Sequence, residues 1–374
     1  MGGLRVAMIG QRGVPATWGG IERHVTELGG RLARRGHIVT VFNRSNYQPQ
    51  KWRHCRGMRV QSLPTVGTKH FDAIVHSLLS TLTALARRFD VVHFHALGPG
   101  LCTPIARMAG SARVVLTIHG LDNQRAKWGG PARRVLDVAE WMSSRVPNET
   151  IVVSNALVDH YRTRHGRHVT YIPNGVNPGM RRPVRRIRER FGLEQGYVLF
   201  VGRLVPEKAP HLLLDAYRQV DGDRPLVIVG GSSFTNDYVA ALHSAARQDP
   251  RVKLLGYVYG DALAELYSNA GAFVLPSALE GLPLTLLEAA SYGVPVVASD
   301  IPPHVEVLIP TGPGRRTFAS GSVEELAAAL SAMLAAPDGE RAGATTLRRD
   351  VLSRYDWERA TTSTESVYEH ALSH

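Results

Sequence analysis

Residues 270–300, AGAFVLPSALEGLPLTLLEAASYGVPVVASD, hold two short apolar runs on either side of a longer amphipathic segment. The runs at 270–277 and 294–300 have the length and composition of buried strands, and the segment at 284–292 repeats its apolar residues with the period of a helix. A strand, a helix and a second strand in this order form the repeating unit of a parallel sheet. The stretch therefore predicts an α/β fold.

The same alternation runs through the whole chain. Further strands are expected at 4–10, 37–43, 90–97, 112–120, 149–156, 197–204, 225–231 and 251–258. Helices are expected at 21–35, 72–88, 131–145, 237–248 and 261–270. Because a chain of 374 residues is long for a single core, the pattern predicts two Rossmann-like domains.

A break between the two sets of strands is expected near residue 178. Turn residues cluster at 174–179, and the arginine-rich run at 181–190 is too charged for a core. The expected domains are 1–178, which is N-terminal, and 179–354, which is C-terminal. The last segment, 355–374, has the pattern of a terminal helix.

The composition is that of an ordinary folded protein, with 44% hydrophobic and 20% charged residues. No run is apolar for the length that a spanning helix needs, and the first apolar run is too short for a secretory signal. Cys55 and Cys102 have neither disulfide nor metal-ligand spacing. A cytoplasmic location is expected, with peripheral contact at the inner membrane face.

That membrane contact is expected from the charge of the first half. Residues 1–194 hold 30 Lys and Arg against 11 Asp and Glu, and residues 195–374 hold 14 against 21, which gives +19 and −7. The basic half predicts an anionic partner, although arginines that merely solvate surface helices would give the same count. The candidates for this contact are Arg31, Arg34, Arg35, Arg53, Arg56, Arg59 and Lys69.

The turn before the helix at 284–292 has the chemistry of a phosphate site. Pro283 suits the first turn of a helix, so the N–H groups of Leu284, Thr285 and Leu286 are expected to be free at the positive end of the helix dipole. Such N–H groups bind anions. The candidate binding residues of this turn are Gly281, Leu282, Pro283, Leu284 and Thr285.

Two carboxylates flank this turn, Glu280 before it and Glu288 inside the helix. Because a carboxylate repels a phosphate, their expected targets are the hydroxyl groups of a ribose or a sugar. Arg203 and Lys208 follow a strand at the position where open α/β sheets bind ligands, and they would neutralise two adjacent phosphoryl groups. The alternative is that these two cations pair with Glu207 or with other surface acids.

The order G-R-x-x-x-x-K at 202–208, followed by E-G-x-P-x-x-x-x-E at 280–288, resembles the signature of the retaining glycosyltransferases of family 4. The stretches IGQRGVPATWGGIERHVTEL and TIHGLDNQRAKWGG are similar to a rhamnosyltransferase-like subgroup of that family. The resemblance covers essentially the whole chain. It implies the GT-B fold, in which two Rossmann-like domains face each other across a cleft and the terminal helix packs back on the first domain.

The resemblance also implies roles for individual residues. Arg203 and Lys208 would hold the donor diphosphate, Glu288 the ribose, and Glu280 would lie beside the donor sugar. The base would lie near Tyr257 and Val258. In the first domain, Gly19 and Gly20 resemble a phosphate loop, Glu22 would face the acceptor, and His119 matches the histidine that contacts the transferred sugar. The expected catalytic residues are Glu280, His119, Arg203 and Lys208.

No metal site is expected. His93 and His95 alternate on one strand and so share a face, but a metal needs at least a third ligand. Asp221 and Asp223 precede a proline and have the pattern of a turn. By resemblance, the donor diphosphate is neutralised by Arg, Lys and a helix dipole, and no cofactor is needed.

The function implied by the resemblance is metal-independent transfer of a sugar, with retention of configuration, from a nucleotide-diphosphate sugar to an acceptor hydroxyl in bacterial polysaccharide or glycolipid assembly. The basic first half adds an anionic or lipid-linked acceptor and contact with the inner membrane surface. A monomer or weak dimer is expected, and no nucleic acid, since the basic half has no reading helix or stacked aromatic pattern. The alternatives are transfer to a soluble natural product and a GT-B sugar-nucleotide epimerase.

Overall fold

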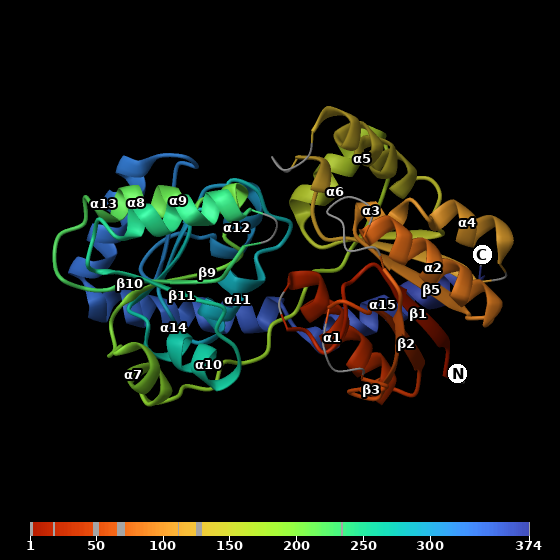
Figure 1. Cartoon of the computed structure of the whole chain (residues 1–374), viewed down its shortest axis with the longest axis horizontal. Helices are drawn as coiled ribbons and strands as arrows, with labels where there is room; N and C mark the ends of the chain where they lie inside the picture. Colours follow the sequence, from red (N-terminus) through yellow and green to blue (C-terminus); the bar gives the residue numbers. More distant parts are fainter. Residues whose placement is uncertain are drawn as a thin grey trace. The chain divides into compact units, whose positions relative to one another are not determined.

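The computed structural model describes residues 3–17, 19–47, 52–65, 72–110, 112–124, 129–232 and 235–373. The chain divides into two compact units, Met1–Gly175 with Trp357–His374, and Val176–Asp356. Each unit is built around one largely parallel sheet (Figure 1). This confirms the α/β fold class with two Rossmann-like domains.

The sheet of the first unit has eight strands in the order β3-β4-β2-β1-β5-β6-β7-β8. All neighbours are parallel except β3 and β4. The strands are β1 (Arg5–Ile9), β2 (Ile38–Arg44), β3 (His54–Cys55), β4 (Met58–Leu63), β5 (Val91–His95), β6 (Arg113–Ile118), β7 (Glu149–Val152) and β8 (Thr170–Tyr171).

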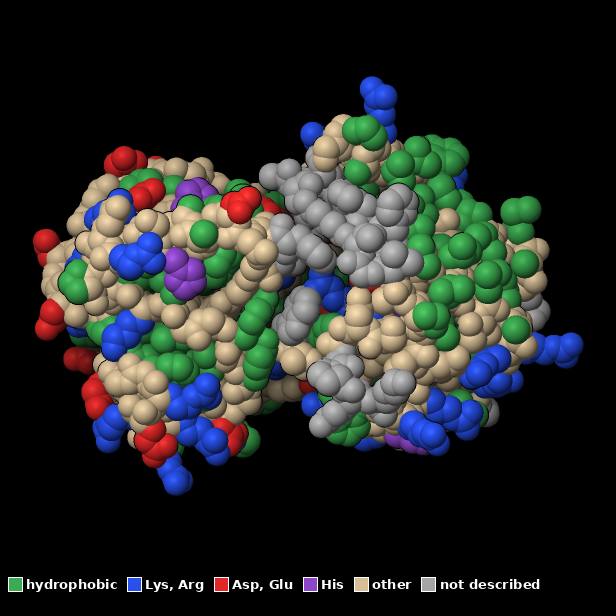
Figure 2. Space-filling model, viewed as in Figure 1, with side chains coloured by type: hydrophobic (Ala, Val, Ile, Leu, Met, Phe, Trp, Pro, Cys, Tyr) green, Lys and Arg blue, Asp and Glu red, His purple; other side chains and the backbone are tan. Residues whose placement is uncertain are grey.

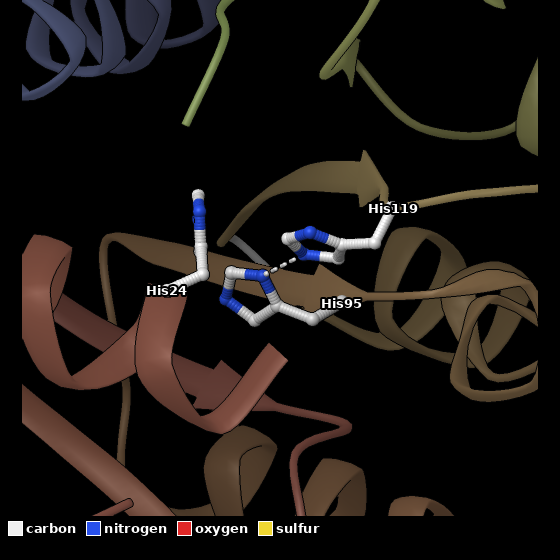
Figure 3. A group of neighbouring side chains, drawn as sticks. All are labelled: His24, His95 and His119. Carbon is white, nitrogen blue, oxygen red and sulfur yellow. Dashed lines mark hydrogen bonds between the residues drawn. The ribbon is translucent and has the colours of Figure 1, made fainter. Parts of the chain in front are cut away.

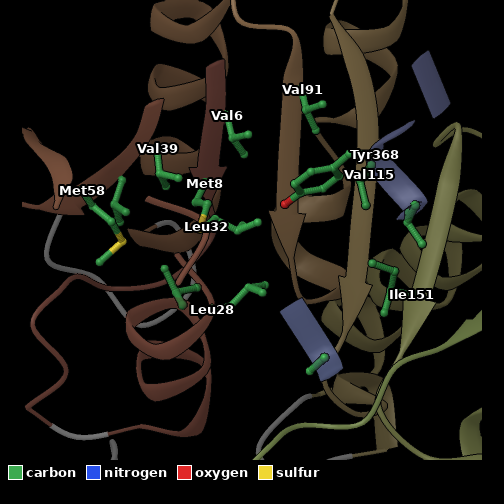
Figure 4. Packing of buried hydrophobic residues seen from close by; sticks show 14 of the residues in the cluster. Val6, Met8, Leu28, Leu32, Val39, Met58, Val91, Val115, Ile151 and Tyr368 are labelled. Atoms are coloured by element: carbon green, nitrogen blue, oxygen red, sulfur yellow. The ribbon is translucent and has the colours of Figure 1, made fainter. Parts of the chain in front are cut away.

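The helices of the first unit are α1 (Gly20–Arg34), α2 (Asp72–Ala86), α3 (Leu97–Gly100), α4 (Thr103–Ala109), the 3-10 helix η1 (Asp122–Gln124), α5 (Gly130–Ser143), α6 (Asn155–His165) and the terminal α15 (Trp357–Ser373). Helix α15 contacts α1 and β6. Its Tyr368 joins Val6, Met8 and Leu28 in one buried cluster, so the end of the chain completes the core of the first unit (Figure 4).

The second sheet has six parallel strands in the order β11-β10-β9-β12-β13-β14. The strands are β9 (Val198–Val201), β10 (Leu226–Val229), β11 (Val252–Gly256), β12 (Ala272–Leu275), β13 (Val296–Ser299) and β14 (Arg315–Phe318). The helices are α7 (Arg186–Phe191), the 3-10 helix η2 (Pro206–Lys208), α8 (Pro210–Tyr217), α9 (Asn236–Ala246), α10 (Gly260–Asn269), α11 (Leu284–Ser291), α12 (Pro302–Leu308), α13 (Val323–Ala335) and α14 (Pro337–Arg354).

Strand order reverses once in each sheet. In the first sheet β1 lies between β2 and β5, and in the second β9 lies between β10 and β12. At such a reversal, open α/β sheets bind their ligands beside the carboxyl ends of the two central strands. Lys208 follows β9 and Glu280 follows β12, the two strands at the reversal of the second sheet.

The elements expected from apolar periodicity are present. Periodicity missed the very short strands β3 and β8. It also missed β4, in which polar residues alternate with apolar ones, and β14, which begins with two arginines. Asp221 and Asp223 lie between α8 and β10, as the expected turn requires. No helix in the described part of the chain is both long and apolar enough to span a membrane.

Most of the arginines expected to face an anionic partner are in ion pairs instead. Arg31 and Arg35 contact Glu358 of α15 at 3.0 and 2.7 Å. Arg34 lies 3.7 Å from the same carboxylate. Arg56 contacts Glu27 at 2.8 Å. These side chains join α1 to its neighbours, whereas Arg53 and Arg59 line a separate surface cavity and Lys69 lies outside the described residues.

Candidate functional site

The second unit brings Lys208 and Glu280 into contact. Lys208 ends η2 after β9, and Glu280 lies in the loop after β12, the neighbouring strand. The ammonium group of Lys208 contacts Oε1 of Glu280, and Ser277 Oγ donates to the same oxygen at 2.8 Å. The N–H of Ala278 donates to the carbonyl of Glu207 at 2.9 Å and fixes the two loops to each other. Lys208 therefore pairs with Glu280 and not with Glu207.

The Glu280 carboxylate is held in its charged form. Burial by itself would raise its pKa, but the charge of Lys208, the nearby His304 and the hydrogen bonds from Lys208 and Ser277 together lower the pKa below its usual value. Only 10% of the Glu280 side chain and 14% of the Lys208 side chain are exposed. The loops after β9 and β12 thus hold a preorganised pair of opposite charges. Arg203, half-buried, follows the same strand as Lys208.

His304 is a neighbour of this pair that the sequence did not indicate. It lies near the start of α12, where Nδ1 is 3.0 Å from both the carbonyl and the hydroxyl of Ser299. Burial lowers its pKa to about 4, although the charge of Glu280 opposes this shift. The buried Nε2 has no hydrogen-bond partner among the described residues. A neutral imidazole beside Glu280 therefore presents one unused nitrogen.

The start of α11 differs in one detail from expectation. Pro283 is the N-cap residue, and its carbonyl accepts the N–H of Leu286 at 3.1 Å, so that N–H is not free. No side chain caps the helix. The hydroxyl of Thr285, in the first turn, is buried and has no hydrogen-bond partner within the described chain. An uncapped helix start with a buried, unused hydroxyl can accept an anion.

Glu288 lies farther along α11, where the hydroxyl of Tyr267 donates to its Oε2 at 3.1 Å. Tyr267 stacks on Tyr292, with ring centroids 5.5 Å apart. Glu288 is half-buried, so part of its side chain reaches the surface. Its carboxylate is held in place by the packed ring of Tyr267. Gly281 and Leu282 are buried in the turn between Glu280 and Pro283.

Tyr257 and Val258 follow β11. The Tyr257 hydroxyl donates to the carbonyl of Ser232 at 2.9 Å, and its ring lies so close to Gly231 that a Cβ there would approach it to 2.4 Å. Val258 is buried. Tyr257 thus lies over the loop after β10, and the glycine in that loop permits the close approach.

In the first unit, the loop after β1 requires glycine at position 19. Gly19 is the N-cap of α1 with φ of 109°, and a Cβ there would lie 1.8 Å from Oε2 of Glu22. Gly20 is the first residue of the helix. Glu22 is buried, and its Oε1 accepts the N–H of Arg12 at 2.9 Å. Glu22 therefore ties the loop to the helix, and its expected role of facing the acceptor stays a prediction.

Four histidines converge near the carboxyl ends of β5 and β6. His93 and His95 share a face of β5, with ring centroids 4.3 Å apart, as strand alternation predicted. His119 follows β6, and its Nε2 lies 3.3 Å from Nδ1 of His95 (Figure 3). His24, from α1, packs its ring 4.6 Å from that of His119. The sequence did not indicate His24, because it is one polar position within a helical pattern.

These rings are held neutral. Burial lowers the pKa of His24 to about 4 and that of His93 to about 3, and it lowers those of His95 and His119 well below the usual value. His24 Nδ1 lies 2.6 Å from Oδ1 of Asn174. The Nε2 atoms of His24 and His95 have no hydrogen-bond partner among the described residues. The cluster can therefore accept hydrogen bonds from hydroxyl groups.

Among the residues that the structure describes, two groups of side chains have the spacing of metal ligands. Ring nitrogens of His24, His95 and His119 lie within 4.8 Å of one another, and so do atoms of Glu140, His160 and His165. In the second group, both imidazoles lie 2.7 Å from Oε1 of Glu140, so hydrogen bonds already account for it. In the first group, His95 and His119 contact each other through ring nitrogens and His24 contacts Asn174, so hydrogen bonds account for part of that group as well.

Comparisons with known proteins give the family. A profile described as Glycosyltransferase Family 4 matches residues 18–179, and one described as Glycosyl transferases group 1 matches residues 183–345. The chain is 30% identical to a D-inositol 3-phosphate glycosyltransferase of Geodermatophilus obscurus, over 94% of this chain and 84% of that one. It belongs to the family 4 type of GT-B glycosyltransferases.

Two further proteins show how far the similarity extends. A GDP-mannose-dependent alpha-(1-6)-phosphatidylinositol monomannoside mannosyltransferase of Mycobacterium tuberculosis is 30% identical over 76% of this chain and 78% of its own. The solved structure of sucrose-phosphate synthase from Thermosynechococcus elongatus matches with a TM-score of 0.85 at 24% identity, over 99% of both chains. The fold is thus GT-B along the whole chain, and the rhamnosyltransferase-like subgroup stays a prediction.

Proposed function

We propose that this chain transfers a sugar from a nucleotide-diphosphate sugar to an acceptor hydroxyl, with retention of configuration and without a metal ion. One observation carries the proposal: the buried Lys208–Glu280 pair and the uncapped start of α11 follow the same strand-order reversal in the second sheet. Because such a sheet binds its ligand at this reversal, a cation, an anion and helix N–H groups would all lie close to the donor.

Charge development explains why these groups suit the reaction. When the bond between the sugar C1 and the diphosphate breaks, positive charge grows on the sugar and negative charge on the leaving diphosphate. Lys208, Arg203 and the start of α11 would stabilise the leaving group, because they are fixed donors that need no reorganisation. The acceptor oxygen bonds to C1 on the same face, and its proton passes to the leaving diphosphate.

Glu280 is assigned to the donor sugar. Its carboxylate is buried and charged, so it can accept hydrogen bonds from sugar hydroxyls and stabilise positive charge on the ring. Attack of a carboxylate on C1 would also give retention through a covalent intermediate. The front-face path is preferred because Glu280 is already engaged by Lys208 and Ser277.

The first unit is assigned to binding of the acceptor. His24 and His95 each have a ring nitrogen without a partner among the described residues, and these nitrogens can bind hydroxyl groups without adding charge. His119 lies beside them as a third neutral ring. Gly19 and Gly20 leave the start of α1 open to a phosphate. The base of the donor is assigned to Tyr257 and Val258, and its ribose to Glu288.

The relatives favour an acceptor that carries phosphate, in glycolipid or polysaccharide assembly. One relative is named for inositol 3-phosphate and another for a phosphatidylinositol monomannoside. The excess of positive charge in residues 1–194 fits such an anionic or lipid-linked acceptor. Membrane contact at the inner face and a monomer or weak dimer are part of the same proposal.

Label transfer tests the proposal against its alternatives. The protein is incubated with a set of radiolabelled nucleotide sugars, alone and with a bacterial lipid extract. We expect the label in the organic phase and release of one nucleoside diphosphate. Conversion of the donor without any acceptor would establish an epimerase, and label in a water-soluble product only would establish a soluble acceptor.

A further inference from the structure

Helix α2 has its polar and apolar faces reversed. Its buried positions carry His76, Ser77, Ser80 and Thr81, whereas its exposed large side chains are Ile74, Leu78 and Leu82. These three recur every fourth residue and so form one stripe along the helix. A helix that borders water normally places its apolar stripe inward. The outer face of α2 is therefore suited to an apolar medium.

Neighbouring helices extend this apolar surface. Helix α2 contacts α3 and α4, and α3 contacts α5. On α4, Met108 is 87% exposed, and on α5, Val138 and Trp141 are 53% and 51% exposed. Figure 2 shows hydrophobic side chains gathered over the part of the first unit that carries α2 and α4. The outer surface consists of Ile74, Leu78, Leu82, Ile105, Met108, Val135, Val138 and Trp141.

The charges around this surface have one sign. Helices α2, α4 and α5 together carry three carboxylates, and none of them is both exposed and unpaired. Asp72 pairs with Arg44, and Asp137 accepts a hydrogen bond from Asn123. Glu140 is buried. In contrast, Arg107, Arg133, Arg134 and Arg145 are exposed and form no ion pair among the described residues. Arg134, Val138 and Trp141 recur at helical spacing on one face of α5, and Arg145 follows shortly after the helix ends at Ser143.

We propose that the outer faces of α2, α4 and α5 form a membrane-docking surface that inserts Leu, Ile, Met and Trp side chains into the interface of a bilayer rich in anionic phospholipid. Apolar side chains that enter the acyl boundary, flanked by arginines that meet the headgroups, are the features of an interfacial contact. Trp141 suits the headgroup level, where Trp is enriched. The cation–π contact of Arg145 with Trp141, at 4.7 Å, keeps both groups at the same depth.

This surface differs from the one that the charge count indicated. The arginines of α1 are occupied by Glu358 and Glu27, whereas those of α4 and α5 form no such pairs and border exposed apolar side chains. A second copy of the chain could also cover an apolar face, but the arginine border without exposed carboxylates would repel its own copy. The inference deepens the membrane contact of the proposed function, on which it rests, by naming the surface that makes it and by assigning this contact to delivery of a lipid-linked acceptor.

Vesicle flotation tests the surface. The full chain is mixed with vesicles of phosphatidylglycerol and phosphatidylcholine, or of phosphatidylcholine alone, at low and high salt. The variants are Leu78→Gln with Leu82→Gln, and Arg134→Gln with Arg145→Gln. Ile309→Gln is the matched control, because Ile309 is 56% exposed and Leu82 50%, but Ile309 lies in the second unit. All of these side chains are on the surface, so the variants should fold, which thermal unfolding verifies.

We expect the wild type and Ile309→Gln to float with anionic vesicles, and the leucine variant to lose at least about tenfold in partition. The arginine variant should lose the preference for phosphatidylglycerol and most of its salt dependence. Brominated lipids should quench the tryptophan fluorescence of the wild type more than that of Trp141→Phe. Equal flotation of the leucine variant and the wild type, or no flotation of the wild type, would overturn the proposal.

Two controls separate this proposal from others. Each variant is also titrated with nucleoside diphosphates. If the leucine variant binds nucleotide normally but no longer floats with vesicles, the result supports the docking surface. If the wild type floats but neither it nor any variant binds a nucleotide, the result counts against the proposed function alone. Size-exclusion chromatography monitors oligomeric state. A dimer in the wild type that becomes a monomer in the leucine variant, with flotation unchanged, would make this face a contact between copies and overturn the membrane assignment.

Discussion

Lys208 and Glu280, 72 positions apart in the chain, form a buried ion pair between the loops after β9 and β12. A buried pair of this kind is costly in desolvation, and removal of one partner leaves the other uncompensated. Such a pair at the carboxyl edge of a sheet is consistent with a role in binding. In the proposed reaction, Lys208 faces the leaving diphosphate while Glu280 faces the sugar.

Replacement of Glu280 by glutamine should separate binding from turnover. The amide keeps the size and the hydrogen-bonding capacity of the side chain but releases Lys208 from its partner. We expect unchanged or tighter binding of the nucleoside diphosphate, and a fall in kcat of about 10²- to 10³-fold, as for loss of one preorganised group. Calorimetry and transfer assays measure the two quantities. Turnover within twofold of the wild type would remove Glu280 from the proposed site.

Replacement of the buried Thr285 by valine should weaken nucleotide binding without lowering the stability of the fold. Thr285→Val keeps the shape of the side chain but removes a polar atom that has no hydrogen-bond partner in the described structure. Stability should stay the same or rise, because an unsatisfied buried group costs about 1–3 kcal/mol. Affinity for the nucleoside diphosphate should fall about 3- to 10-fold, the value of one hydrogen bond. A loss of stability with unaltered affinity would show a structural role instead.

Gly19 should tolerate no side chain. Gly19→Ala combines a φ of 109° with a Cβ at 1.8 Å from the Glu22 carboxylate. We expect a loss of about 1–3 kcal/mol in the free energy of unfolding, with a distorted loop at the start of α1. Gly98→Ala is the control, since its Cβ would meet nothing within 4 Å. Similar stability of the two variants in urea unfolding would contradict the strain at position 19.

Buried histidines predict acid sensitivity. Burial lowers the pKa of His24 to about 4 and that of His93 to about 3, whereas an unfolded histidine titrates near 6.5. As the pH falls, the unfolded chain therefore binds protons before the folded chain does. Between about pH 6.5 and the pKa of the folded state, each such histidine lowers the free energy of unfolding by about 1.4 kcal/mol per pH unit. Urea unfolding at several pH values should show this loss below about pH 6.5.

His93→Gln should make that pH dependence shallower, because glutamine can still bond to Thr117 and Tyr368 but does not titrate. The exposed His243→Gln serves as the comparison. An identical slope in both variants would show that His93 does not contribute to the acid sensitivity.

Removal of divalent metals should leave transfer intact. Arg203, Lys208 and the start of α11 supply positive charge to the diphosphate, so the proposed reaction needs no ion. Transfer in the presence of a chelator should equal that in its absence. If activity is lost and is restored by added zinc, the trio of His24, His95 and His119 would be the first candidate for the metal site.

Periodicity predicted most strands and helices, because apolar residues at intervals of two or near 3.6 report burial directly. It missed β14, where Arg315 and Arg316 hide the strand pattern. It also could not show that the apolar stripe of α2 faces outward. The spacing of apolar residues shows that a helix has two different faces, but it does not show which face packs against the core. Packing of the neighbouring helices decides that.

The candidate site was partly predictable. Lys208 and Glu280 could be singled out from their places after strands, but their direct contact depends on the adjacency of β9 and β12 in the sheet. His304 and His24 were missed because each appears as one polar residue in a helical segment. The charge count did not show that Arg31 and Arg35 are paired with Glu358, because it cannot distinguish an arginine that solvates a surface from one paired with a distant carboxylate. Contact of the basic half with an anionic partner stays a prediction.

The most direct test of the central claim is a calorimetric titration of UDP, GDP, TDP and ADP into the wild type, Lys208→Ala and the control Lys253→Ala. Lys253 is also a cation of the second unit, but it contacts the carbonyl of Phe191, beyond the proposed site. We expect one nucleoside diphosphate to bind the wild type and the control with equal affinity. The same nucleotide should bind Lys208→Ala at least about 30-fold more weakly, as for loss of a charged hydrogen bond. Equal binding by all three proteins would contradict this expectation.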